Sequence, residues 1–154
     1  NDSKKIPKKK REELSSYIKQ NSIYSIGEAS VEEIDRLNIL NASLLAMERA
    51  IKNLSSQPES ILVDGSFKPM NNTNIFSIVK GDTKSISIAA ASIVAKVYRD
   101  QLMAKFSEFH PEYKFENNSG YGTKEHQKAL LKFGISPIHR RSFKPIHYIL
   151  NNKD

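Results

Sequence analysis

Two aspartates follow apolar stretches of the chain, at positions where a carboxylate could bind a cation. Asp64 comes directly after Ile61-Leu62-Val63 and before Gly65, and Asp82 comes 18 residues later, after a second apolar stretch and a glycine. Carboxylates at the ends of neighbouring strands can share a hard cation, because Mg²⁺ and Mn²⁺ prefer oxygen ligands and tolerate water in their remaining positions. Each aspartate also has a structural interpretation, Asp64 as a turn residue before glycine and Asp82 as a helix N-cap.

A tyrosine between two glycines points to contact with a nucleotide. In Gly120-Tyr121-Gly122-Thr123 the glycines allow a close backbone approach, while the ring could lie on a sugar or a base. Alternatively, the ring packs on a following helix that Thr123 caps. The segment His139-Arg140-Arg141-Ser142-Phe143 offers basic donors and a hydroxyl for phosphate contact, or it is a basic tail. His126 is either a metal ligand or a surface residue of the helix.

These residues need elements to position them, and the apolar periodicity predicts alternating helices and strands. One expected helix has Pro7 in its first turn, and another begins at the Ser30–Glu33 capping box. Three more span about 41–54, 84–109 and 123–133. The expected strands lie at 23–26, at 61–63 as a buried strand, and at 75–79. Such alternation predicts a mixed α/β domain.

Positive charge is concentrated at the two ends of the chain. The net charge is +7; residues 1–11 contain six lysines and arginines with one acid, and residues 121–148 contain six with one acid. Residues 28–64 carry seven acids and three bases instead. Two basic ends around an acidic middle favour a polyanionic partner such as nucleic acid. The alternative is a basic surface that keeps the protein soluble.

The composition excludes several classes of protein. No apolar run approaches the ~18 residues of a membrane span, and the basic start lacks the apolar core of a signal peptide. With no cysteine, the chain has no disulfide, thiolate nucleophile or cysteine-bound zinc, so a metal would have to bind carboxylates or histidines. We expect a cytoplasmic protein with no membrane association. Because residue 1 is Asn rather than Met, we also expect an N-terminal piece to be missing.

Seven segments, taken together and in this order, resemble bacterial ribonuclease HII. They are Asp2-Ser3-Lys4-Lys5, Glu33-Ile34-Asp35 with Asn38-Ile39-Leu40-Asn41-Ala42, Val63-Asp64-Gly65, Lys80-Gly81-Asp82, the run from Ala89 to Asp100, the run from Gly120 to His126, and His139-Arg140-Arg141-Ser142-Phe143. Each is weak alone, but in register they cover nearly the whole chain from residue 2 to about 145. The resemblance implies a ribonuclease H-like α/β fold, a mixed sheet with flanking helices, and an endonuclease that depends on Mn²⁺ or Mg²⁺.

Asp64 and Asp82 match the third and fourth metal-binding, catalytic carboxylates of that family. The family's first two ligands are an Asp-Glu pair on an earlier strand, followed by a Gly-Arg-Gly that contacts the ribose 2′-hydroxyl. Residues 1–154 contain no such segment. The resemblance therefore implies that the chain is the C-terminal three-quarters of a ribonuclease HII without its first central strand. It also implies that the chain by itself is nearly inactive.

The resemblance also implies substrate contacts. Tyr121 would stack on the sugar at an RNA–DNA junction. Lys4 would lie near a substrate phosphate with Ser3 beside it, and Arg140 and Ser142 would contact substrate on the same surface.

The remaining parts would support this site. Residues 1–154 would form one truncated ribonuclease H-like domain, with about 123–154 as a C-terminal helical substrate-binding part. The helix over 84–109 would lie behind the site, with Lys96, Arg99 and Asp100 in largely structural roles.

The implied reaction is hydrolysis of the RNA strand of RNA/DNA hybrids and incision at ribonucleotides embedded in duplex DNA. Two metal ions would serve the attacking water and the leaving 3′-oxygen, so that products carry 5′-phosphate and 3′-hydroxyl ends. The implied partners are RNA/DNA hybrid and ribonucleotide-containing duplex DNA, bound by a monomer. Two other functions stay open: a non-catalytic RNA/DNA hybrid-binding module, and an interaction protein whose basic surface binds acidic partners.

Overall fold

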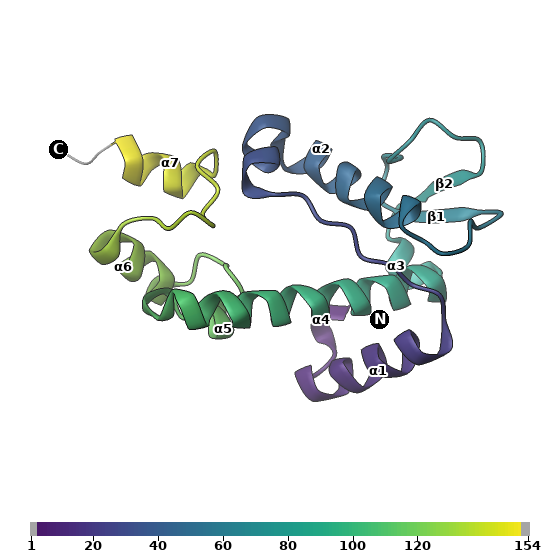
Figure 1. Cartoon of the computed structure of the whole chain (residues 1–154), viewed down its shortest axis with the longest axis horizontal. Helices are drawn as coiled ribbons and strands as arrows, with labels where there is room; N and C mark the ends of the chain where they lie inside the picture. The colour runs from purple at the N-terminus through teal and green to yellow at the C-terminus, as the bar shows by residue number, and fades with distance from the viewer. Residues whose placement is uncertain (1–2, 152–154) are drawn as a thin grey trace. The chain divides into compact units, whose positions relative to one another are not determined.

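The computed structural model describes residues 3–151, which form two compact units (Figure 1). The first unit consists of the chain up to residue 29 and residues 40–97, and the second of residues 30–39 and the chain from residue 98 onward. Two long helices, α2 (Val31–Lys52) and α4 (Ile86–Phe109), contribute to both units. Among residues 3–151, no helix combines the length and the hydropathy needed to cross a bilayer. The expectation of one domain over 1–154 stays a prediction.

The first unit begins with the 3-10 turn η1 (Ser3–Lys5) and helix α1 (Lys8–Asn21). Pro7 is the N-cap of α1; proline lacks an N–H, and the start of a helix does not need one. Arg11 is buried, and its Nη1 donates hydrogen bonds to the carbonyl oxygens of Ser3 (3.1 Å) and Ile6 (3.0 Å). Arg11 therefore holds the turn that contains Ser3 against α1, although it belongs to the basic N-terminal segment.

The strand expected at 23–26 is wrong: this segment is assigned to no strand. It leads instead into a close contact with α2, where a Cβ atom on Gly27 would come within 2.0 Å of the Ala46 carbonyl oxygen. The Ser25 hydroxyl also donates a hydrogen bond to the Ala50 carbonyl. This segment therefore packs against helix α2 instead of pairing with a strand. The apolar residues at 23–26 do not indicate which kind of element the segment contacts.

Helix α2 begins at the predicted capping box. The Ser30 N–H donates to Glu33 Oε2 (2.9 Å), and the Glu33 N–H donates to Ser30 Oγ (3.2 Å). Asn38 interrupts the helix with φ 70° and ψ 166°, a backbone conformation outside the left-handed helical region that is strained for any residue with a Cβ. The two helices predicted from the capping box and from the apolar residues of 41–54 therefore follow one another across this kink.

The other two predicted strands pair in parallel. Strand β1 (Ile61–Asp64) lies beside β2 (Ile75–Ile78) (Figure 1). In the register of this pair, Asp64 is opposite Ile78. Val63 is buried, but Leu62 on the opposite face is 41% exposed, so the expectation that 61–63 is buried is wrong for that face. The described residues thus contain a helix-rich α/β fold with a small parallel sheet, which confirms the expected fold class.

After β2 the chain enters two consecutive helices. Lys80 (φ 56°) leads into the short helix α3 (Gly81–Lys84), and the extended residue Ser85 separates α3 from α4. The long helix predicted over 84–109 is therefore confirmed from Ile86 to Phe109, whereas Lys84 ends α3 instead. In the first unit α4 buries four apolar side chains: Ile88, Ile93, Val94 and Val97.

The second unit is built on the last turns of α4. Four short elements follow: η2 (Pro111–Tyr113), α5 (Phe115–Asn118), α6 (Lys124–Phe133) and α7 (Lys144–Asn151). Their core consists of Met103, Tyr113, Phe115, Leu130 and Ile146. Helix α6 begins at its N-cap Thr123 and ends at Gly134 (φ 81°), as predicted. The assignment of 123–154 to substrate binding stays a prediction.

Candidate functional site

The structure brings Asp64 and Asp82 into neighbouring positions of the first unit. Asp64 ends β1, and its Oδ1 accepts a hydrogen bond of 2.7 Å from the N–H of Gly81, the residue directly before Asp82. Gly81 is buried, and a Cβ atom there would come within 2.5 Å of the Ile88 side chain and 3.4 Å of Asp64 Oδ1. Glycine therefore allows the start of α3 to approach the end of β1 closely.

The donor chemistry of this pair fits part of the shell of a hard cation. Asp64 is exposed and Asp82 is half-buried, so both carboxylates remain accessible from solvent. Because Asp64 uses Oδ1 for Gly81, its Oδ2 can face a cation. Residues 3–151 contain no group of three or more acidic, histidine or cysteine side chains that could hold a metal. Two carboxylates suit a Mg²⁺ or Mn²⁺ ion that keeps several waters.

In the second unit, the backbone around Tyr121 is fixed while its ring is exposed. The Tyr121 N–H donates to the Asn118 carbonyl (2.8 Å), and the Tyr121 carbonyl accepts from the Thr123 N–H (2.8 Å). Asn118 is buried, and its side-chain oxygen accepts from the Gly120 N–H (2.8 Å). The Tyr121 side chain is 60% exposed. A ring held out on a fixed loop is suited to stacking.

Arg99 lies beside this loop, although sequence reasoning gave it a structural role. Its Nη2 is 3.3 Å from the point where a Cβ on Gly120 would be. Desolvation, followed by the nearby charge of Arg140, lowers the pKa of the Arg99 guanidinium, while Tyr121 and Asp100 oppose the shift. Two arginines therefore share the neighbourhood of the Tyr121 loop. Local sequence spacing cannot predict that Arg99 and Arg140 are close, because they are far apart in the sequence.

The segment around Ser142 is organised by Asp35, which belongs to one of the seven resembling segments but was given no role from the sequence. Asp35 Oδ2 accepts a hydrogen bond from the Arg141 N–H, and its Oδ1 accepts one from the Ser142 N–H, each 3.0 Å long. The Ser142 hydroxyl also donates to Asp35. Although desolvation opposes it, these bonds and the charge of Arg140 lower the pKa of Asp35. The Ser142 hydroxyl is thus engaged within the protein.

Three exposed lysines and the half-buried Arg140 of this unit are better placed for contact with an anion. Lys124, Lys128 and Lys132 are all exposed and recur at every fourth residue, so they follow one face of α6. The Arg140 guanidinium lies over the Phe143 ring, 4.8 Å from its centroid. We call the three lysines the α6 lysine row.

The remaining predicted substrate residues lie in the first unit, in η1. Ser3 is half-buried, and its carbonyl oxygen accepts the bond from Arg11. The side chain of Lys4 lies outside the described residues.

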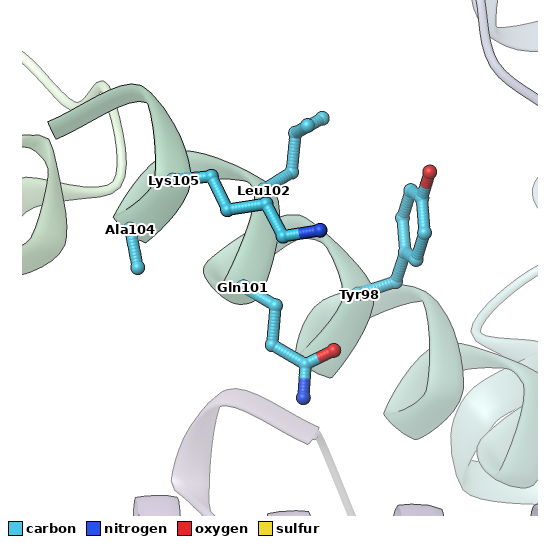
Figure 2. Close-up of a pocket in the computed structure, with 5 residues that line it drawn as sticks. All are labelled: Tyr98, Gln101, Leu102, Ala104 and Lys105. Carbon is cyan, nitrogen blue, oxygen red and sulfur yellow. The ribbon is translucent and has the colours of Figure 1, made fainter. Parts of the chain in front are cut away.

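A shallow hollow on α4 contains none of the candidate residues. Its lining side chains all come from one stretch of the helix: Tyr98, Gln101, Leu102, Ala104 and Lys105 (Figure 2). With a single helix as its wall, it has few features of a ligand site.

Comparisons with known proteins identify the family of this chain. A sequence model described as ribonuclease HII matches residues 1–146. The ribonuclease HII of Pelagibacter ubique is 52% identical over 150 residues, which are 97% of this chain and 81% of that protein. The ribonuclease HII of Ruegeria pomeroyi is 52% identical over 151 residues, which are 97% of this chain but 64% of that protein.

A solved structure shares the fold. The crystal structure of the ribonuclease H2 from Pyrococcus horikoshii OT3 matches with a TM-score of 0.78 and 25% sequence identity. The match covers 99% of this chain and 82% of that one. Sequence and structure therefore agree over almost the whole chain, and the chain belongs to the ribonuclease HII family.

Proposed function

We propose that this chain carries metal-binding and substrate-contacting residues of an enzyme that hydrolyses the RNA strand of RNA/DNA hybrids. Membership of the ribonuclease HII family supports ribonuclease H activity in general. The proposal extends it to incision at single ribonucleotides in duplex DNA, leaving 5′-phosphate and 3′-hydroxyl ends. The observation that carries it is the hydrogen bond from Gly81 to Asp64, because it ties Asp64 to the segment that contains Asp82.

In this proposal Asp64 and Asp82 hold Mg²⁺ or Mn²⁺ together with the substrate phosphate and with carboxylates that the described residues do not include. When bound, such ions lower the pKa of a coordinated water and neutralise charge on the phosphate, which is the chemistry of two-metal phosphodiester hydrolysis. The protein orients Asp64 through Gly81, so that one carboxylate oxygen is committed to the fold and the other to the ligand.

Substrate binding is assigned to the second unit. The exposed Tyr121 ring would stack on a sugar at the RNA–DNA junction, while Arg140 and the α6 lysine row would contact phosphates. The Ser142 hydroxyl already donates to Asp35, so we propose that Ser142 mainly holds the backbone next to Arg140 in place. Ser142 also remains part of the proposed substrate-contacting surface. Ser3 and Lys4 are proposed as a further phosphate contact.

The test is strand cleavage by the chain extended with the Asp-Glu and Gly-Arg-Gly segment expected from the family resemblance, here called the extended protein. The substrates are a uniform RNA/DNA hybrid, duplex DNA with one ribonucleotide, and all-DNA duplex, each with Mn²⁺, Mg²⁺ or EDTA. We expect cleavage of the first two only, with a divalent metal, and product ends that a ligase requiring 5′-phosphate accepts. The unextended chain is the comparison.

Two results would contradict the proposal. Cleavage that persists in EDTA would remove the metal role of Asp64 and Asp82. Selective binding of hybrid without cleavage by the extended protein would identify a non-catalytic hybrid-binding module instead.

A further inference from the structure

Two histidines in the second unit form a buried contact that the proposed chemistry does not use. His126 on α6 and His139 after that helix are 4% and 7% exposed, and their Nε2 atoms are 3.1 Å apart. His126 was a candidate ligand or surface residue by sequence; it is neither exposed nor part of a cluster of three metal-binding side chains among residues 3–151. Two neutral rings in such contact must share one proton between the facing nitrogens.

The backbone partners of the two rings determine where their protons are. At one end, the Ser136 N–H can only donate, and it lies 3.0 Å from His139 Nδ1, so that nitrogen is an acceptor. The Ser136 hydroxyl lies 2.8 Å from the same nitrogen and therefore donates to it as well. At the other end, the Tyr121 carbonyl can only accept, and it lies 2.9 Å from His126 Nδ1, so that nitrogen carries a proton. His139 Nε2–H must therefore donate to the lone pair of His126 Nε2.

This line of bonds runs in one direction, from Ser136 through both rings to the Tyr121 carbonyl. The surroundings hold the rings in place: Tyr113 packs edge-on against His139 with centroids 4.8 Å apart, and Phe115 packs edge-on against His126 at 5.5 Å. Tyr113 is itself fixed by donating its hydroxyl proton to the Gly134 carbonyl (3.0 Å). The line thus connects two backbone segments through the core of the unit.

We propose that His126 and His139 form a positioning pair that fixes the backbone of Tyr121 relative to the segment leading to Arg140. The proposal rests on the proposed role of Tyr121 in binding nucleic acid. A loop that is already ordered loses less conformational freedom on binding, so the pair contributes to affinity without touching the substrate. The Tyr121 carbonyl accepts bonds from both His126 and Thr123, which makes it the fixed point of the loop.

The first test concerns the pair itself and needs no substrate. In the chain as it exists, ¹⁵N shifts of the ring nitrogens report which nitrogen of each histidine carries the proton. At pH 7.5 we expect a single neutral form of each ring: protonated at Nδ1 in His126 and at Nε2 in His139. Mixed tautomers, or the same tautomer in both rings, would overturn the proposal.

The second test asks whether the pair acts through Tyr121. His126→Phe keeps an aromatic ring but removes both nitrogens, whereas His126→Asn keeps a donor near the Nδ1 position. The affinity is measured by fluorescence anisotropy for duplex DNA with one ribonucleotide, at fixed salt. We expect His126→Phe to weaken binding by about threefold to tenfold, the size of a typical coupling between contacting residues. His126→Asn should restore most of the loss, and the exposed His147→Phe is the matched control.

A double-mutant cycle separates positioning from packing. In the Tyr121→Ala background, His126→Phe should cause no further loss of affinity, because the ring that it positions is gone. Equal losses with and without Tyr121 would mean that His126 only supports the fold, and would overturn the proposal. If Tyr121→Ala binds like the unmutated chain, the proposed function of Tyr121 fails instead, and the ring-nitrogen shifts still decide whether the pair exists.

Discussion

At the residue scale, hydrogen bonds within the protein decide which candidate side chains remain available to a ligand. Asp64 commits one carboxylate oxygen to Gly81 and keeps the other, whereas the Ser142 hydroxyl is bonded to Asp35. Tyr121 is fixed through its backbone, and its ring is exposed. A side chain whose type suggests a function in the sequence is therefore available to a ligand only if its polar atoms are not already bonded within the protein.

The first prediction concerns the charge of Asp64. Asp64→Asn keeps an oxygen that can accept the Gly81 N–H but removes the negative charge that a cation requires, so the fold should persist while metal binding is lost. In the extended protein we expect cleavage to be abolished and hybrid affinity to stay nearly unchanged. Mn²⁺ binding followed by water proton relaxation, together with cleavage rates, checks this.

The control for Asp64→Asn is Glu59→Gln, which removes an exposed carboxylate shortly before β1. This control should bind Mn²⁺ and cleave normally. Full turnover by Asp64→Asn would show that Asp64 is not a metal ligand.

The second prediction concerns the Tyr121 ring. Tyr121→Ala should cost roughly 1–3 kcal/mol of stacking, which is about 5- to 150-fold in binding or rate. Because the ring is 60% exposed, the melting temperature should change little. We expect a larger loss on duplex DNA with one ribonucleotide than on a uniform hybrid, measured as two cleavage rates of the extended protein. A lower melting temperature with equal losses on both substrates would instead assign Tyr121 to packing.

At the element scale, α6 combines two faces with different tasks. One side buries His126 and Leu130 in the core, and another carries the α6 lysine row in solvent. The helix begins at Thr123, two residues after Tyr121, so its N-cap also fixes the end of the tyrosine loop. The same ten residues thus support the core, the loop and a charged surface.

The third prediction follows from the lysine row. Each phosphate contact releases about 0.9 counterion from B-form duplex, so replacing Lys124, Lys128 and Lys132 by Gln should flatten the slope of log affinity against log salt by roughly 3. The loss of affinity should be the same for substrates of different base sequence, because contacts to phosphates do not read the bases. Replacing three other exposed lysines, Lys52, Lys68 and Lys105, is the charge-matched control. If both triple variants keep the original slope, the row serves solubility only.

At the scale of the whole molecule, two compact units share two long helices, and the candidate residues are divided between them. Asp64 and Asp82 belong to the first unit, and Tyr121, Arg140 and Ser142 belong to the second. Each unit has its own buried apolar residues, around Val63 and Ile75 in the first and around Tyr113 and Phe115 in the second. Residues 30–39 join the second unit through Asp35.

The fourth prediction concerns acid stability. Desolvation, followed by the charge that His126 can carry, lowers the pKa of His139 to about 4 from its ordinary 6.5, and His110 adds to the shift. The unfolded chain takes up this proton near pH 6.5 and the folded protein only near 4, so the free energy of unfolding should fall over that window as the pH decreases. Tyr113 and Phe115, which also face the ring, stay neutral there.

Chemical denaturation at pH 7.5, 5.5 and 4.5 measures this dependence. His139→Phe should remove the part of the pH dependence of the unfolding free energy that the His139 ring contributes. His147→Phe, at an exposed position, should leave that pH dependence unchanged. An identical decline in His139→Phe and in the unmutated chain would contradict the assignment.

Local sequence patterns were sufficient wherever neighbouring residues determine the structure. The capping box of Ser30 and Glu33, the strands ending at Asp64 and before Lys80, and the helix between Thr123 and Gly134 all follow from short-range hydrogen bonds and periodicity. The family was also evident from the order of short motifs, which the family match over residues 1–146 confirms.

Tertiary structure decided what depends on contacts between distant residues. Three features involve partners that no local pattern indicates. They are the absence of a strand at 23–26, the Asp35 bonds to Arg141 and Ser142, and the buried pair of His126 and His139. A residue's periodicity indicates which face it occupies, but burial and hydrogen bonding depend on what the rest of the chain places opposite that face. For this reason a histidine that looked like a surface residue is buried, and a serine that suited phosphate is bonded to an aspartate.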